Sequence, residues 1–334
     1  MIDVLELTRR LVAVESQTGA EAPATTLLHE ALRGLGYEVH LQEVSPGRHN
    51  LYAYREPPEL VFSTHLDTVP PYVPLREDDD FIHGRGSCDA KGLAAAMVAA
   101  AEQLADGGER RIGLLFLVGE EYGSDGARAA ASLTPKGRFL INGEPTENQL
   151  TIGQKGALEV VITAEGRAAH SAYPEEGASA ILPLLDAIEQ IRHLDLPTDR
   201  LLGKCTLNVG LLEGGVAPNV IPPSARATLL FRTVEPTEEL RHRIEKAAGS
   251  KVRVDFRAEI PAFKGTAPDG WDTAVVSFAS DLPFLAPWGQ CFQMGPGTIR
   301  VAHTDEERIA KAELLEGVER YFQLARDLLG GGQD

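Results

Sequence analysis

The sequence predicts an α/β fold in which a layered α/β domain is interrupted by an inserted ferredoxin-like α+β domain. Helix and strand patterns alternate through about the first 150 residues, which is typical of a layered α/β domain. Residues 156–260 instead give six elements in the order β-α-β-β-α-β, the split βαβ arrangement of ferredoxin-like domains. Helix and strand patterns then resume. We therefore expect one discontinuous domain at 1–155 and 261–334, and an inserted domain at 156–260.

Each element of the first domain follows from a local pattern of apolar residues. Apolar residues recur at helical spacing in the expected helices, and glycines stand near the end of the second helix. The run RIGLLFLVG is almost wholly apolar, as expected of a central strand that is buried on both faces. The expected helices are 3–15, 23–36 and 92–105, and the expected strands are 38–43, 51–53, 60–64, 111–119 and 139–143.

The inserted domain and the segment after it follow from the same kind of pattern. Pro236 takes the first turn of the second helix, where a proline is tolerated. The strand patterns are ALEVVITAEG, CTLNVGLLEG, SARATLLFRTV and KVRVDFRAEI, and the helix patterns are GASAILPLLDAIEQI and PTEELRHRIEKAAG. Beyond them we expect a helix near 272–279, a short strand near 290–294 and a last helix from about 304 to 329.

The composition narrows the classes of partner. The chain has 32 Lys and Arg against 49 Asp and Glu, a formal net charge of −17, whereas a nucleic-acid-binding surface needs clustered basic residues. No apolar run approaches the ~20 residues that span a membrane, and MIDVLELTRRLVAV has the pattern of an amphipathic helix rather than a signal peptide. Three cysteines without a CxxC motif argue against a disulfide framework or a cysteine-rich zinc site. We expect a cytoplasmic protein that binds neither nucleic acid nor membrane.

Histidines and carboxylates follow the ends of successive expected strands. In STHLDT, His65 and Asp67 are two positions apart, so on an extended chain both side chains leave on the same face. In open α/β sheets, chemistry collects beyond the carboxyl ends of the strands. We therefore expect the polar residues at these ends to meet at one edge of the sheet. They are His65, Asp67, Asp89, Glu120, Glu121, Glu144 and His303.

This set of residues predicts a metal centre. Five converging carboxylates would repel one another and raise each other's pKa, and bound cations would remove that repulsion. Two divalent ions bring +4, the three carboxylates Asp89, Glu121 and Glu144 bring −3, and one bridging hydroxide makes the cluster neutral. Mixed imidazole and carboxylate ligands without thiolates suit zinc, with cobalt or manganese as alternatives. Glu120 is then left beside the metals, free to act as a general base.

Each of these residues also has an ordinary structural explanation. Taken alone, His65 would be a buried histidine, Asp89 a helix N-cap, and Glu144 a turn residue before Pro145. Their joint placement at the ends of successive strands favours the metal centre over these explanations. Other histidines, such as His83, lack this setting and are expected at the surface.

Six motifs together resemble the M20 family of metallo-aminohydrolases, in the family's order and over essentially the whole chain. They are STHLDTVP, GRGSCDAKG, VGEEYGSDGA, NGEPT, GRAAHSAYPEEG and GPGTIRVAHTDEE. Within the family, the chain looks most like the acetylornithine deacetylases and their relatives, including succinyl-diaminopimelate desuccinylase. The resemblance implies a catalytic domain of the zinc-aminopeptidase type, and an inserted domain that serves as a lid and forms a homodimer.

The resemblance also implies how the metal ligands are shared. Asp89 would bridge the two metals and precede a cis peptide bond. His65 and Glu144 would complete one metal site, and Glu121 and His303 would complete the other.

The remaining roles concern the reaction and the substrate. The resemblance implies that Asp67 supports the His65 ring and that Glu120 carries the proton. His170 would reach across the dimer to stabilise the developing oxyanion. Among residues expected to contact the substrate, Arg232 would grip its α-carboxylate, a task that suits a bidentate guanidinium. The others are Asn219 and Gly295.

The implied reaction is removal of an acyl group from a small N-acyl amino acid, with N-acetylornithine as the first candidate. The chain is short for such a deacetylase, so other substrates stay open. They include those of a dipeptidase, an aminoacylase or a succinyl-diaminopimelate desuccinylase. A hydrolase that releases lysine or ornithine from a carrier protein would need a basic docking patch, which the net charge of −17 disfavours. A metal-free binding relative is the alternative of a different class, and the intact set of ligands argues against it.

Overall fold

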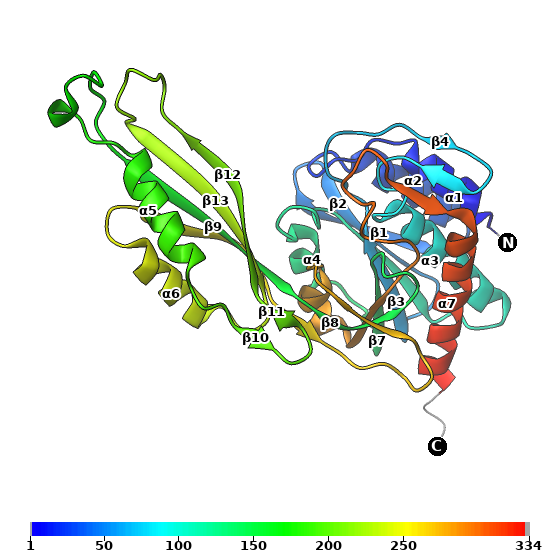
Figure 1. Cartoon of the computed structure of the whole chain (residues 1–334). Helices are drawn as coiled ribbons and strands as arrows, with labels where there is room; N and C mark the ends of the chain where they lie inside the picture. The colour runs from blue at the N-terminus through cyan, green and yellow to red at the C-terminus, as the bar shows by residue number, and fades with distance from the viewer. Residues whose placement is uncertain (1, 331–334) are drawn as a thin grey trace. The chain divides into compact units, whose positions relative to one another are not determined.

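Figure 1 shows a computed structural model of the chain, which describes residues 2–330. The chain forms two compact units. Unit 1 comprises 2–152, 265–274 and 280–330, and unit 2 comprises Gly153–Lys264 with Val275–Ala279. The limits expected from the sequence lie close to these, and the assignment of a catalytic domain and a lid stays a prediction.

Unit 1 contains a six-stranded sheet in the order β1-β2-β6-β3-β7-β17. The last four strands in this order run parallel, so their carboxyl ends meet at one edge. Strand β2 runs antiparallel to both of its neighbours, β1 and β6. Strands β3 and β6 are buried along their whole length, as expected of central strands. The strands are β1 Glu38–Ser45, β2 Arg48–Tyr54, β3 Leu60–His65, β6 Ile112–Leu117, β7 Phe139–Gly143 and β17 Gln290–Met294.

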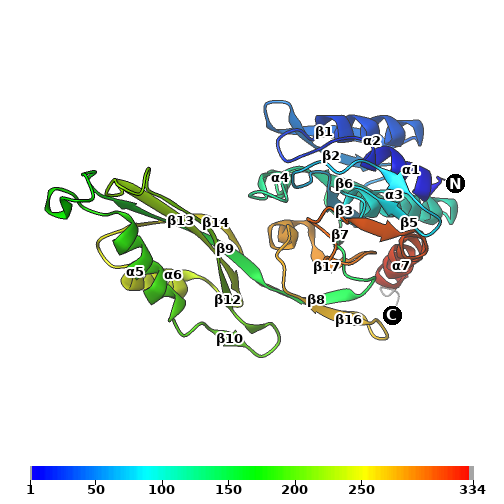
Figure 2. The same cartoon turned by 45° about the horizontal axis from the view of Figure 1, so that its top comes forward.

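Helices cover both faces of this sheet and make unit 1 three layers thick (Figure 2). One core joins α1, α2, α3 and α7 to alternate strand residues such as Leu60 and Phe62. On the opposite face, the 3₁₀ helix η2 (Leu282–Trp288) places the Trp288 ring 5.1 Å from that of Tyr52. The helices are α1 Val4–Val12, α2 Ala22–Gly34, α3 Lys91–Asp106, α4 Asp125–Ala130 and α7 Lys311–Gly330.

Two smaller sheets correct the sequence-based expectations after residue 260. The helix expected near 272–279 is wrong: Thr273–Val276 form strand β16, because consecutive β-branched side chains favour an extended chain. It pairs in the order β15-β8-β16, with β8 Leu150–Gln154 and β15 Phe263–Lys264. The last helix begins at Lys311 rather than near 304, since Arg308–Ala310 form β18. This strand pairs with β5 Phe81–His83, which in turn pairs with β4 Arg76–Glu77.

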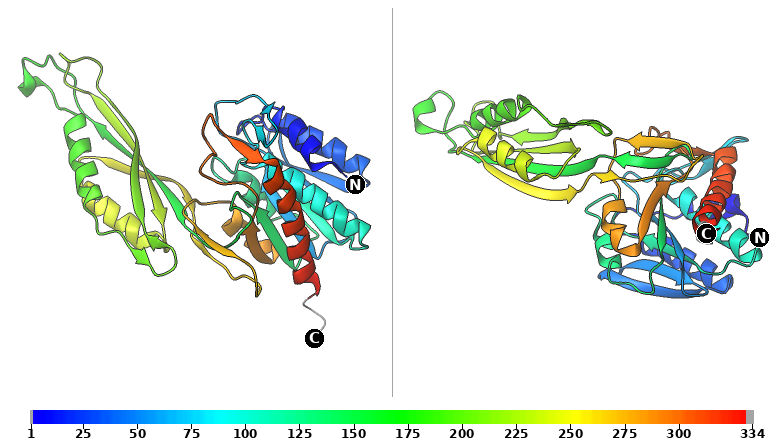
Figure 3. Two further views of the ribbon diagram at one scale, coloured as in Figure 1. Left: turned by 45° about the vertical axis from the view of Figure 1, so that its right-hand side comes forward. Right: turned by 90° about the horizontal axis from the view of Figure 1, so that it is seen from below.

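Unit 2 has the β-α-β-β-α-β order that the sequence predicts (Figure 3). Its antiparallel sheet has the order β12-β13-β9-β14, and α5 and α6 pack on one face. Alternate residues of β13 are buried, as expected of a strand with one face on a core. The main elements are β9 Gly156–Glu165, α5 Ile181–Arg192, β12 Thr206–Gly214, β13 Ser224–Thr233, α6 Glu238–Ala248 and β14 Arg253–Ile260. The shorter elements are η1 Pro174–Glu176, β10 Thr198–Asp199 and β11 Gly203–Lys204.

Within residues 2–330, no helix combines the length and the apolar character needed to cross a bilayer. A cytoplasmic location stays a prediction.

Candidate metal centre

The carboxyl edge of the unit 1 sheet brings two histidines onto one aspartate. Strand β3 ends at His65, whose Nε2 lies 3.0 Å from Oδ1 of Asp89. The other oxygen of this carboxylate, Oδ2, lies 3.4 Å from Nε2 of His303. His303 has φ 62°, a left-handed conformation that is uncommon outside glycine and is often found at functional sites. Asp89 thus presents one oxygen to each histidine.

Glu121 joins the same cluster from the end of β6. Its Oε2 lies 2.9 Å from Nε2 of His303. Ligand atoms of His65, Asp89 and Glu121 all lie within 4.8 Å of one another. Four of the five expected ligands therefore meet, although they come from four separate segments of the chain.

Glu144 follows β7 and is buried near this cluster. Its Oε1 lies 3.5 Å from Nδ2 of Asn142. Burial raises the pKa of Glu144 well above its ordinary value; His65 opposes this shift and Asp89 adds to it. Glu144 therefore lies close enough to interact electrostatically with both residues.

Asp67 is fully buried and supports both the histidine and the glutamate pair. Nδ1 of His65 lies 2.9 Å from the backbone carbonyl oxygen of Asp67 and 3.5 Å from Oδ1 of the Asp67 side chain. The same carboxylate accepts hydrogen bonds from the backbone N–H groups of Glu120 and Glu121, at 3.0 and 3.1 Å, and from the Thr18 hydroxyl at 2.8 Å. The contact with the glutamate backbone was not anticipated from the sequence, because it links residues more than 50 positions apart.

The pKa shifts show how strongly these groups interact. Burial alone would lower the pKa of His65, but Asp67 and Asp89 raise it well above its ordinary value. Asp89 and Glu121 raise the pKa of His303 to about 10. Burial alone would raise the pKa of Asp89, but His303 and His65 hold it well below its ordinary range. The two histidines and Asp89 therefore stabilise one another's charged forms.

Glu120 is the expected proton carrier, and that role stays a prediction. It is partly buried, and burial raises its pKa well above the ordinary value, with a further increase from Glu144. A carboxylate whose pKa lies nearer to neutrality exchanges protons more readily at neutral pH.

Two further residues differ from sequence-based expectations or were missed by them. Asp281 is 1% exposed, and burial raises its pKa to about 7, although the buried Ser124 hydroxyl opposes the shift. A single aspartate in a loop gives no pattern that could have revealed it. His83, expected at the surface, is buried, and its Nε2 lies 2.8 Å from Oδ2 of Asp78. Its strand β5 is the middle strand of the small sheet β18-β5-β4, a position that the sequence did not reveal.

The turn that carries Asp89 has the cis peptide bond that the family resemblance implies. This bond joins Asp89 and Ala90. Cys88 is fully buried, and its Sγ lies 3.5 Å from the carbonyl oxygen of Thr298.

Gly295 follows β17 and packs against the segment after β7. A Cβ atom at this position would lie 2.6 Å from Cδ2 of Leu93 and 2.7 Å from the carbonyl oxygen of Glu144. Its backbone carbonyl accepts hydrogen bonds from the N–H groups of Thr146 and Asn148. Close backbone packing accounts for the glycine, and substrate contact stays a prediction.

The other expected substrate residues belong to unit 2. His170 and Asn219 are exposed on two loops, which are joined by a hydrogen bond of 3.0 Å from the Ser171 N–H to the Asn219 carbonyl. Arg232 is half-buried on β13, where it pairs with Thr206 of β12. Their proposed roles stay predictions.

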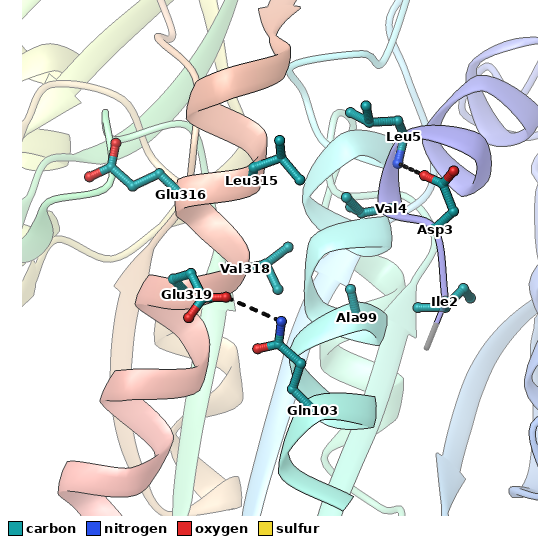
Figure 4. Close-up of a pocket in the computed structure, with 10 residues that line it drawn as sticks. All are labelled: Ile2, Asp3, Val4, Leu5, Ala99, Gln103, Leu315, Glu316, Val318 and Glu319. Atoms are coloured by element: carbon teal, nitrogen blue, oxygen red, sulfur yellow. Dashed lines mark hydrogen bonds between the residues drawn. The ribbon is translucent and has the colours of Figure 1, made fainter. Parts of the chain in front are cut away.

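A groove in unit 1 lies among α1, α3 and α7 (Figure 4). It has a volume of about 410 Å³ and is lined by residues such as Leu5, Ala99 and Leu315. None of the expected site residues lines it.

Comparison with known proteins identifies the family. A sequence model of peptidase family M20/M25/M40 matches residues 61–327. A peptidase M20 domain-containing protein of Schizosaccharomyces pombe is 37% identical over 336 residues, which cover 96% of this chain and 84% of that protein. The chain belongs to this family.

Other proteins are similar over almost the whole chain. A probable carboxypeptidase of Neosartorya fischeri is 36% identical over 381 residues, covering 98% of this chain and 86% of that protein. The crystal structure of a tripeptidase from Staphylococcus aureus has the same fold, with a TM-score of 0.79, 24% identity, and coverage of 97% of this chain and 98% of that one. The predicted fold and the predicted class, a metallohydrolase that cleaves amide bonds, are confirmed at the level of the M20 family.

Proposed function

We propose that this M20 enzyme uses two divalent metal ions to hydrolyse one amide bond in short peptides or N-acyl amino acids that carry a free α-carboxylate. The observation that carries the proposal is the position of Asp89, with one carboxylate oxygen beside His65 and the other beside His303. A carboxylate placed in this way suits two ions better than one.

The donor set fits zinc, with cobalt or manganese as alternatives, since it combines imidazoles and carboxylates without a thiolate. His65 and Glu144 would hold one ion, Glu121 and His303 the other, and Asp89 would be shared. When bound, the two ions supply positive charge that polarises a carbonyl group and acidifies a water molecule.

Glu120 moves the proton in this proposal. Its carboxylate accepts a proton from the attacking water and returns it to the nitrogen of the leaving amine, so that the C–N bond breaks and one water is consumed. The Asp67 carboxylate accepts a hydrogen bond from the backbone N–H of Glu120, and this bond fixes the position of Glu120.

The residues of unit 2 take the substrate roles. We assign to His170 of the partner subunit a hydrogen bond to the developing oxyanion, and to Arg232 the α-carboxylate of the substrate. We assign Asn219 and Gly295 to further substrate contacts. These assignments, and the homodimer that the first of them requires, rest on the family motifs.

Peptides are the first substrates to test, because the similar proteins are named as a carboxypeptidase and a tripeptidase. N-acetylornithine and other N-acyl amino acids present the same amide beside an α-carboxylate and remain in the proposal as a second class.

The proposal is tested by amine release from a panel of dipeptides, tripeptides, N-acetyl and N-succinyl amino acids, including N-acetylornithine. The metal-free protein and the protein reconstituted with zinc or cobalt are compared. We expect metal-dependent release from at least one member of the peptide or N-acetyl class. Reconstituted protein that binds metal and releases no amine from any member would contradict the proposal.

A further inference from the structure

A buried ion pair in unit 1 joins segments that carry the expected metal ligands. Arg85 and Glu307 are each 1% exposed, and Nη1 of Arg85 donates to Oε2 of Glu307 at 2.6 Å. Removing two charges from water is costly, so a pair of this kind persists only when further hydrogen bonds support it. The proposed reaction assigns no role to either residue.

The second oxygen of Glu307 holds the turn that carries Asp89. Oε1 accepts hydrogen bonds from three backbone N–H groups, those of Gly86 at 2.9 Å, Cys88 at 3.3 Å and Asp89 itself at 3.1 Å. The backbone of the shared ligand is therefore fixed directly by a charged acceptor, and charged acceptors form the stronger hydrogen bonds.

The guanidinium group of Arg85 reaches two further segments. Its Nη1 also donates to the carbonyl oxygen of Thr304 at 3.1 Å, one residue beyond His303. Its Nε donates to the carbonyl oxygen of Pro71 at 3.2 Å, in the segment that follows Asp67. One ion pair thus ties together three stretches of chain that each hold a residue of the centre.

We propose that Arg85 and Glu307 are positioning residues of the metal centre, and that they set the separation between Asp89 and His303. This inference rests on the dinuclear centre proposed above. Without the pair, the Asp89 turn and the His303 segment lose the groups that hold them at a fixed distance. The metal site that uses both ligands is therefore weakened more than the site that uses His65 and Glu144.

The pair has a matched control in the same unit. Arg55 and Glu102 form an ion pair of 2.8 Å with side chains only 10% and 14% exposed. Glu102 also accepts a hydrogen bond from the Tyr37 hydroxyl, and Arg55 donates to the carbonyl oxygen of Leu35. Neither of these groups belongs to a segment that carries an expected ligand. Glu102→Gln therefore removes a comparable charge without touching the centre.

The experiment is a calorimetric titration of the metal-free full chain with Co²⁺, with the visible absorption of the bound ion as a second readout of ligand geometry. For Glu307→Gln we expect one of two binding steps to weaken by about 10- to 100-fold, the usual effect of removing a group that orients metal ligands, with an altered Co²⁺ spectrum. Arg85→Lys keeps the positive charge but loses the several N–H donors of the guanidinium group. It should weaken the same binding step, by a smaller factor than Glu307→Gln does. Glu102→Gln should leave both steps unchanged.

Folded variants that bind both Co²⁺ ions as the wild type does would overturn the inference, and so would an equal loss in Glu102→Gln. If Glu307→Gln does not fold, Arg85→Lys decides by the same criteria. Co²⁺ binding is measured without substrate, so a failure of the proposed hydrolysis leaves the interpretation of this experiment unchanged.

Discussion

The two units present their expected functional residues in different ways. In unit 1, the ligand candidates other than the exposed His303 are largely buried, and four of the five are in mutual contact, as the 3.0 Å between His65 and Asp89 illustrates. In unit 2, His170 and Asn219 are exposed on loops. The His170 side chain accepts a local hydrogen bond, from the Ala172 N–H to its Nδ1 at 3.1 Å.

This difference separates metal binding from substrate recognition. Unit 1 holds the proposed ligands His65, Asp89 and Glu121 within 4.8 Å of one another, so we expect little further ordering when metal binds. In unit 2, the candidates His170 and Asn219 lie on exposed loops, so we expect their roles to depend on substrate or on a second copy. Changes in unit 1 should therefore alter metal binding or proton transfer, and changes in unit 2 should alter turnover alone.

Glu120→Gln should have the largest effect on turnover. The amide cannot accept the proton, so we expect kcat to fall by about 10²- to 10⁴-fold, the usual contribution of a general base. Metal content should stay at the wild-type value, because Glu120 is not among the proposed ligands. Steady-state kinetics and metal analysis check both points. Near-normal turnover would remove Glu120 from its proposed role.

His170→Asn should have the next largest effect and sharpens the comparison between the units. Loss of an oxyanion donor typically lowers kcat by about 10²- to 10³-fold. Zinc affinity should not change, because unit 2 contributes no proposed ligand. If zinc binding weakened along with kcat, the separation of roles between the units would be wrong.

Asp67→Asn should have an intermediate effect that appears in metal binding. The substitution removes the charge that supports His65 and weakens an acceptor for the backbone of Glu120 and Glu121, so we expect zinc affinity to fall by about 10- to 100-fold. His65→Ala is the comparison variant and should lose one metal ion outright. Equal loss in the two variants would argue that Asp67 is itself a ligand.

Asp281→Asn should have the smallest effect on turnover and a pH-dependent effect on stability. The folded pKa of about 7 lies above the ordinary value of 3.8, so the folded state holds more protons than the unfolded state between these two pH values. Stability of the metal-free protein is therefore lost as pH rises from about 4 to 7. The variant should be more stable than the wild type at pH 8, by up to about 4 kcal/mol, and similar to it at pH 4. Urea unfolding at both pH values checks this, and a constant difference would contradict it.

The sequence predicted the elements and site residues that local patterns define. The run RIGLLFLVG placed Glu120 and Glu121 at the end of a central strand, and STHLDT placed His65 at the end of another. The sequence did not predict long-range contacts. The Glu307 carboxylate accepts a hydrogen bond from the backbone N–H of Asp89, 218 positions away, and no local pattern encodes this contact. The helix expected near 272–279 failed because its apolar spacing suited a helix, whereas Thr273, Val275 and Val276 favour a strand.

The central claim is that unit 1 assembles a site for two metal ions from residues at the edge of its sheet. The most direct test is a zinc titration of the metal-free full chain that measures the number of ions bound. We expect two zinc ions per wild-type chain and one per chain in His303→Ala. A wild-type chain that binds no more than one ion, or a His303→Ala chain that still binds two with wild-type affinity, would contradict the account.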